Sequence, residues 1–151
     1  MAWLNLIRWK NLLIILVTQL LAWWCVIMPL EHLYHGSLLL HTGNFAWLCA
    51  STILIAAAGY IINDYFDIRI DIINRPEKVI LEKRIPRRMA ILSHIFLNAA
   101  ALAAAMVVAR RAGQYEWLLL QIICMALLWF YSTHFKRQFI TGNICLALLT
   151  A

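Results

Sequence analysis

The amino-acid sequence predicts an all-α protein, a bundle of helices that crosses a lipid bilayer several times. Of its 151 residues, 64% are hydrophobic and 13% are charged, and the mean hydropathy is +0.78. Soluble domains carry roughly twice that share of charged residues. The apolar residues form runs close to the roughly 20 residues that a helix needs to cross the hydrocarbon. These observations together favour a multi-spanning transmembrane bundle.

Four complete spans and the beginning of a fifth are expected. Their approximate bounds are 11–30, 45–66, 89–109, 116–134 and 142–151. The fifth run is still apolar at Ala151, where the last carbonyl groups of a half-built helix would remain unpaired in lipid. We therefore expect a single transmembrane domain that is incomplete at its C-terminus, the N-terminal part of a longer chain.

The first run could also be a secretory signal peptide, because Arg8 and Lys10 precede it. The stretch Trp23–Pro29 offers no small-x-small cleavage site, and the apolar core is long for a signal peptide. A retained membrane helix is the better interpretation.

Basic residues predict the orientation in the membrane. Arg8 and Lys10 precede the first span, seven Lys or Arg residues lie between spans two and three, and Lys136 and Arg137 follow span four. The opposite side carries only Arg110 and Arg111. By the positive-inside rule, the N-terminus and the second connection face the cytoplasm, with the cell inner membrane the expected location. This distribution accounts for the net charge of +6 without any nucleic-acid partner.

Four oxygen-bearing side chains lie at the end of the second span: Asn63, Asp64, Asp67 and Asp71. Asn63, Asp67 and Asp71 are four residues apart and share one helical face, while Asp64 is one position round. Clustered carboxylates repel one another unless a cation neutralises them, and hard oxygen ligands suit Mg²⁺, which keeps positions for water and phosphates. The pattern predicts a magnesium site for a diphosphate. The alternative is a solvated charged segment whose acids and bases pair with one another.

The same helix is expected to continue past Asp71 and to end at Asn74-Arg75-Pro76, since a residue before proline avoids the α region.

Other polar residues within spans are expected to have structural roles. His94 and Asn98 are four residues apart and should satisfy each other or a neighbouring backbone, as should Thr18, Gln19 and Gln121. The four cysteines lie in apolar runs without metal-ligand spacing and are interpreted as small buried residues. His32, His35 and His41 are expected at the interface.

Two motifs resemble those of the UbiA superfamily of intramembrane prenyltransferases. The first is Asn63-Asp64-x-x-Asp67-x-x-x-Asp71 followed by Asn74-Arg75-Pro76, which resembles the first aspartate-rich motif of that superfamily. The second is Tyr131-Ser132-x-x-x-Lys136-Arg137, with Gly142-Asn143 after it. The resemblance implies a fold of about nine transmembrane helices around a central cavity. A second aspartate-rich motif is expected on a later connection, beyond this chain.

The resemblance also implies the reaction: Mg²⁺-dependent transfer of a polyprenyl group from its diphosphate to an aromatic or lipid acceptor, in isoprenoid quinone or prenyl-lipid biosynthesis. Metal ions and fixed cations stabilise the pyrophosphate that leaves. The implied roles are as follows: metal binding by Asn63, Asp64, Asp67 and Asp71, with Asp64 suited to orient the others; catalysis by Asp67, Asp71 and Tyr131; diphosphate binding by Lys136, Arg137, Arg69 and Asn143.

Several of these residues have simpler interpretations. Lys136 and Arg137 could be ordinary positive-inside anchors, Tyr131 a packing residue and Asn143 the cap of the fifth helix. Arg69 is proposed because Ile68 stands where many relatives have a basic residue.

Alternative functions also stay open. A cation transporter could place carboxylates at a membrane boundary, although its acids are expected nearer mid-membrane. A truncated, non-catalytic relative that assembles with a partner is the other alternative. The signature of the CDP-alcohol phosphotransferases, which begins with Asp-Gly and Ala-Arg, is absent. The acceptor stays undecided, with quinone or geranylgeranylglycerol phosphate chemistry favoured by the basic segment that follows Asn74.

Overall fold

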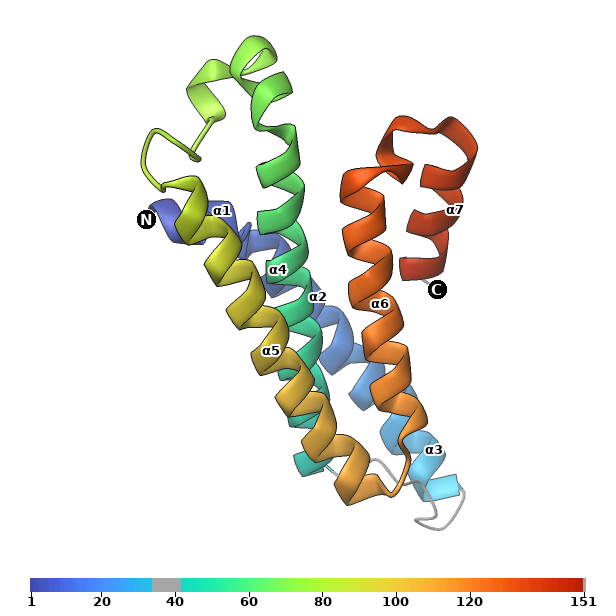
Figure 1. Ribbon diagram of the computed structural model, residues 1–151. Helices are drawn as coiled ribbons and strands as arrows, with labels where there is room; N and C mark the ends of the chain where they lie inside the picture. Colours follow the sequence, from blue (N-terminus) through green and yellow to red (C-terminus); the bar gives the residue numbers. More distant parts are fainter. Residues whose placement is uncertain (34–41, 151) are drawn as a thin grey trace.

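The computed structural model describes residues 1–33 and 42–150, so the predictions for His35 and His41 lie outside the described residues. Its elements are helices (Figure 1). In chain order they are α1 (Ala2–Leu6), α2 (Trp9–Ala22), η1 (Trp23–Ile27), α3 (Met28–Leu33), α4 (Thr42–Asn74), η2 (Pro76–Lys78), α5 (Arg87–Ala112), α6 (Glu116–Thr133), η3 (Phe135–Arg137) and α7 (Phe139–Thr150). The described residues contain no β-strand, only an isolated bridge between Leu81 and Ile85. The all-α prediction is confirmed.

Four helices are long and apolar enough to cross a membrane. They are Trp9–Leu33, which includes the π-helical turn η1, and the helices α4, α5 and α6. Each overlaps one of the four complete spans that the sequence predicts. These helices support a multi-pass integral membrane protein.

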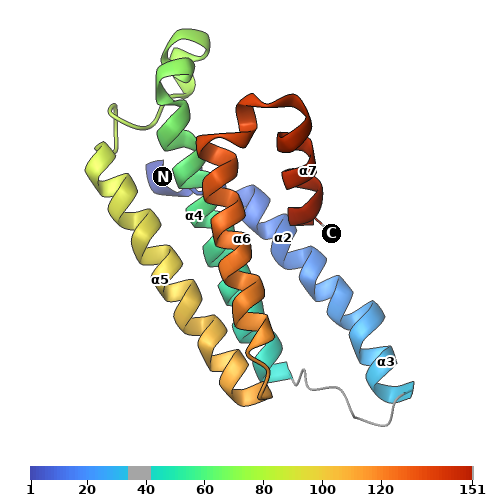
Figure 2. The same cartoon turned by 45° about the vertical axis from the view of Figure 1, so that its right-hand side comes forward.

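The fifth predicted span begins earlier than expected. Helix α7 starts at Phe139, three residues before the predicted start at 142, and turns back beside α6 (Figures 1 and 2). Asn143 therefore lies inside α7, and the interpretation of Asn143 as a helix cap is wrong. The described part of α7 is 12 residues, or about 18 Å, which is shorter than the hydrocarbon thickness.

Helix α4 is the centre of the bundle. It contacts α2, α5 and α6, and Figures 1 and 2 show α5 and α6 running along it. Small side chains let the helices approach closely, as is common in membranes, where packing replaces the hydrophobic effect between helices. The small residues buried here are Ala57, Ala58, Gly59, Ala101, Ala104 and Ala105.

Polar side chains link these helices inside the bundle. The Ser51 hydroxyl of α4 lies 3.0 Å from the Ala101 carbonyl oxygen of α5 and 3.1 Å from Gln121 Oε1 of α6. His94 Nδ1 lies 3.0 Å from the Ala58 carbonyl oxygen, and Asn98 Nδ2 lies 3.1 Å from His94 Nε2. The structural roles predicted for His94, Asn98 and Gln121 are confirmed.

The corresponding prediction fails for Gln19. Its buried Oε1 atom makes no hydrogen bond within the described part of the chain. Thr18, in contrast, donates to the Ile15 carbonyl oxygen of its own helix at 2.8 Å.

The polar end of α4 is covered by α1 and by the segment that follows Pro76. As predicted, α4 continues past Asp71 and ends at Asn74, where Arg75 leaves the helical region before Pro76 (φ −146°, ψ 60°). The chain then folds back along α4. One apolar cluster joins α1, α4, the returning segment and α5 through Leu6, Ile61, Ile68, Leu81, Ile85 and Ala90.

We predict that Gly59→Val destabilises the bundle. A Cβ atom at position 59 would lie 3.1 Å from Leu128 Cδ1 of α6, so a branched side chain would push α4 and α6 apart, at a cost of about 1–3 kcal/mol. Thermal unfolding in detergent should show a lower midpoint for Gly59→Val, partly restored by Leu128→Ala in the same chain. Gly43→Val is the matched control, because a Cβ there has nothing within 4 Å. An equal loss for both glycine variants would contradict the prediction.

Candidate active site

The four oxygen-bearing residues occupy one stripe of α4. An α-helix turns by about 100° per residue, so Asn63, Asp67, Asp71 and Asp64 follow one another round the helix within an arc of about 100°. All four belong to the uninterrupted helix Thr42–Asn74. The predicted common face is therefore present, with Asn63 at one edge and Asp64 at the other.

Lys136 meets the first edge of the stripe. It lies in η3, directly after α6, and its ammonium donates to Asn63 Oδ1 at 3.2 Å and to Asp67 Oδ2 at closer range. The Asn63 amide donates to the same Asp67 oxygen at 3.1 Å. Asp67 is largely enclosed, with 16% of its side chain exposed, against 36% for Lys136. The two sequence motifs, 69 residues apart at this contact, thus form one polar cluster.

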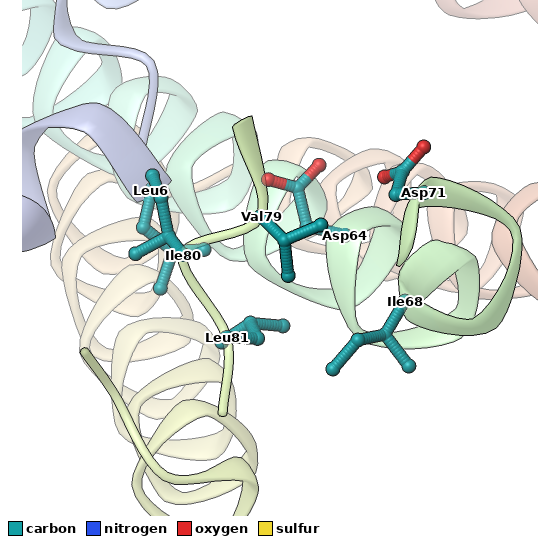
Figure 3. Close-up of a pocket in the computed structure, with 7 residues that line it drawn as sticks. All are labelled: Leu6, Asp64, Ile68, Asp71, Val79, Ile80 and Leu81. Carbon is teal, nitrogen blue, oxygen red and sulfur yellow. The ribbon is translucent and has the colours of Figure 1, made fainter. Parts of the chain in front are cut away.

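The second edge of the stripe faces the N-terminal segment and the segment after Pro76. Asp64 forms an ion pair with Arg8, with an N–O distance of 2.8 Å. Asp64 and Asp71 both line a small cavity of about 30 Å³, large enough for a water-sized guest. Figure 3 shows their carboxylates with the apolar side chains that complete the lining, Leu6, Ile68, Val79, Ile80 and Leu81.

The residues fit a hard divalent cation by chemistry, but they fall into two groups. Asn63 and Asp67 already direct oxygen atoms at one positive charge, the Lys136 ammonium. Asp64 and Asp71 share the cavity instead. Within residues 1–33 and 42–150, no three His, Cys, Asp or Glu side chains come together as a metal site. The structure thus pairs the predicted ligands without gathering all four at one point.

Of the other predicted phosphate ligands, Arg69 lies apart from this cluster. Arg69 is exposed and sits about 200° round the helix from Asp67, which is nearly the opposite side of α4. Asn143 is exposed within α7, and the side chain of Arg137 lies outside the described residues. Of the predicted phosphate ligands with a described side chain, Lys136 is the one that contacts the stripe. Tyr131 is half-buried in α6, five positions before Lys136.

Sequence reasoning assigned Arg8 only a role in membrane orientation. In the structure its guanidinium binds Asp64 and also lies 5.2 Å from the centre of the Tyr60 ring. Tyr60 precedes Asp64 by four residues and lies on the same face of α4. One sequence signal could have suggested the contact of Arg8 with Asp64. Arg8 lies at the start of the first span, on the side of the membrane where the aspartates are expected.

The contact between the two motifs can be tested by cross-linking. In a background without the four native cysteines, Asn63→Cys combined with Lys136→Cys should be joined by a short bismaleimide, because these side chains touch across α4 and η3. The pair Arg69→Cys and Lys136→Cys should remain unlinked, since Arg69 lies on the far side of the helix. Gel mobility after cleavage between α5 and α6 reports the link. Equal cross-linking of both pairs would disprove the arrangement.

Comparisons with known proteins agree with this architecture. The sequence profile described as "UbiA prenyltransferase family" matches residues 22–151. The digeranylgeranylglyceryl phosphate synthase of Methanothermobacter thermautotrophicus is 38% identical over 112 residues, covering 71% of this chain and 37% of that protein. The synthase of the same name from Hyperthermus butylicus is 28% identical over 148 residues, covering 98% of this chain and 46% of that protein.

The chain therefore spans less than half the length of these curated relatives. No solved structure matches it significantly. The family profile covers most of the chain, and it includes the stripe on α4, the Lys136 contact and three of the four candidate membrane spans in full. The chain belongs to the UbiA prenyltransferase family.

Proposed function

We propose that the protein carrying this chain transfers a prenyl group from a prenyl diphosphate to a lipid acceptor that bears a glyceryl phosphate. The observation that carries the proposal is the contact of Lys136 with Asn63 and Asp67. It places a cation that can bind phosphate beside oxygen ligands that suit Mg²⁺, at the end of α4. Family membership supports prenyl transfer, and the names of the relatives support the lipid acceptor.

The reaction replaces one carbon–oxygen bond by another. The allylic carbon–oxygen bond of the donor breaks, and its electron pair leaves with the diphosphate. A hydroxyl oxygen of the acceptor then bonds to the allylic carbon and gives up its proton. The barrier reflects charge separation, because a carbocation and a highly charged diphosphate develop together.

The residues of the α4 stripe and Lys136 act on the leaving group. The Lys136 ammonium, which is exposed beside the largely enclosed Asp67, is suited to donate to a phosphate oxygen as the negative charge develops. Such charge-assisted bonds are stronger than neutral ones. Asn63, Asp67 and Asp71 are the residues that would hold Mg²⁺, with Asp64 at the edge of the set. When bound, Mg²⁺ supplies Lewis-acid stabilisation of the diphosphate oxygens.

The proposed acceptor and orientation follow from the relatives and the charges. Several relatives are named digeranylgeranylglyceryl phosphate synthase, which favours a glyceryl phosphate lipid over the aromatic rings of quinone biosynthesis. Seven bases lie from Arg69, near the end of α4, to Arg88, in the first turn of α5, and they favour a cytoplasmic position for the stripe. Phosphorylated metabolites and Mg²⁺ are available on that side.

The direct test is prenyl transfer in membranes that contain the protein. Radiolabelled geranylgeranyl diphosphate and geranylgeranylglyceryl phosphate should give a labelled diether product in the presence of Mg²⁺. Asp67→Asn should lower turnover on the order of 10²-fold or more, since it removes the charge at the centre of the Lys136 cluster.

Glu116→Gln makes the same acid-to-amide change at the other end of α6, where Glu116 is exposed in the first turn. It should leave turnover unchanged. Undiminished turnover in Asp67→Asn would refute the assigned site, and no turnover in the unmodified protein would favour the non-catalytic alternative.

A further inference from the structure

Arg8 contacts the second edge of the stripe, at Asp64. Its Nη2 atom donates to Asp64 Oδ1 at 2.8 Å, across 56 residues of sequence. The guanidinium also lies over the Tyr60 ring, 5.2 Å from its centre. Arginine presents its donors in a planar, rigid fork, so a guanidinium held by both a carboxylate and an aromatic face has little freedom to turn. Two groups on α4 thus fix the same side chain.

The backbone at Arg8 is shaped to make this contact. Arg8 separates α1 from α2 and adopts a left-handed conformation (φ 52°, ψ 54°), which residues with a side chain seldom adopt. Leu6, two residues earlier, has no exposed surface and packs in the cluster that includes Ile61, Ile68 and Leu81. The turn is therefore anchored on α4 twice, by the packing of Leu6 on Ile61 and Ile68 and by the contacts of Arg8 with Asp64 and Tyr60.

The charges of the stripe are divided between two cations of the chain. Lys136 neutralises Asp67 from η3, and Arg8 neutralises Asp64 from the N-terminal segment. Asp71, which shares the small cavity with Asp64, forms no ion pair among the described residues. With its carboxylate held by Arg8, Asp64 stands at a fixed position beside Asp71.

We infer that Arg8 is a positioning residue of the active site, which holds the Asp64 carboxylate so that the aspartates of α4 present a defined set of oxygen atoms to the metal–diphosphate. This inference rests on the proposed function. Residues that orient metal-binding carboxylates typically contribute about 10- to 100-fold to metal affinity or activity. The N-terminal segment thereby becomes part of the site and is more than a membrane anchor.

The test compares Arg8→Gln, Arg8→Lys and Asp64→Asn in the prenyl-transfer assay. Arg8→Gln should lower kcat about tenfold and raise the Mg²⁺ concentration required for half-maximal activity, with the KM of the acceptor unchanged. Arg8→Lys, which keeps the charge, should recover part of kcat. Lys10→Gln is the matched control, because Lys10 is exposed two residues away and pairs with no acid in the described ranges.

A second measurement needs neither substrate nor metal. Thermal unfolding of the metal-free protein should show that Arg8→Gln and Asp64→Asn each lower the midpoint, and that the double variant is little worse than either single one, because they remove the same contact. Additive losses, or an Arg8→Gln enzyme with the Mg²⁺ dependence of Lys10→Gln, would overturn the inference. A raised donor KM with unchanged kcat would also overturn it, since Arg8 would then act on substrate directly.

The failure of this inference can be told from the failure of the proposed function. If Asp67→Asn abolishes turnover while Arg8→Gln behaves like Lys10→Gln, the function stands and the role of Arg8 falls. If Asp67→Asn retains turnover, the assigned site falls, and the unfolding measurement still decides whether Arg8 and Asp64 act together.

Discussion

Carboxylates at the end of a membrane helix must be compensated by positive charge, and the arrangement around α4 follows from that requirement. Three aspartates within eight residues repel one another, and the cost rises as water is excluded. Two cations of the chain supply this positive charge. Lys136 reaches Asp67 from η3, and Arg8 reaches Asp64 from the turn between α1 and α2. The packing of α6 and of the N-terminal segment against α4 therefore serves the charges of the stripe as well as the apolar core.

The interior of the bundle follows the same rule for uncharged groups. Ser51 with Gln121, and His94 with Asn98 and the Ala58 carbonyl, satisfy polar groups that have no water to bind. Between these pairs, small residues such as Ala58 and Gly59 allow close approach. The polar pairs fix which faces of α4, α5 and α6 meet, and so fix the direction in which the stripe faces.

Much of the fold could be predicted from the sequence because its signals are local. Apolar run lengths located four spans, and Pro76 located the end of α4. The partnership of His94 and Asn98 followed from a spacing of four on one helix. The contact of Asp67 with Lys136 could not be predicted, because it depends on how α6 packs on α4 and periodicity along one helix carries no such information. The family resemblance implied only that both residues act on one metal–diphosphate.

Other positions around the stripe could not be predicted from the sequence. Arg69 was proposed as a phosphate ligand for its charge and its place beside Ile68. It lies about 200° round α4 from Asp67, and its role stays a prediction. The simpler alternative for Asn143, a helix cap, is excluded because α7 begins four residues before it. The diphosphate-binding role of Asn143 stays a prediction. Arg8 was overlooked because its partner lies 56 residues away. The Arg8 contact depends on how distant segments pack, whereas the positions of Arg69 and Asn143 depend on helix geometry and on where α7 begins.

The burial of Leu6 has a consequence for biogenesis. Its neighbours come from α4, from the segment after Pro76 and from the start of α5, so they leave the ribosome long after Leu6 does. The first residues of the chain must therefore wait at the membrane surface until about 80 more have been synthesised, because the pocket that receives them does not exist earlier. Docking of this segment, and with it the pairing of Arg8 and Asp64, is expected to be a late event in assembly.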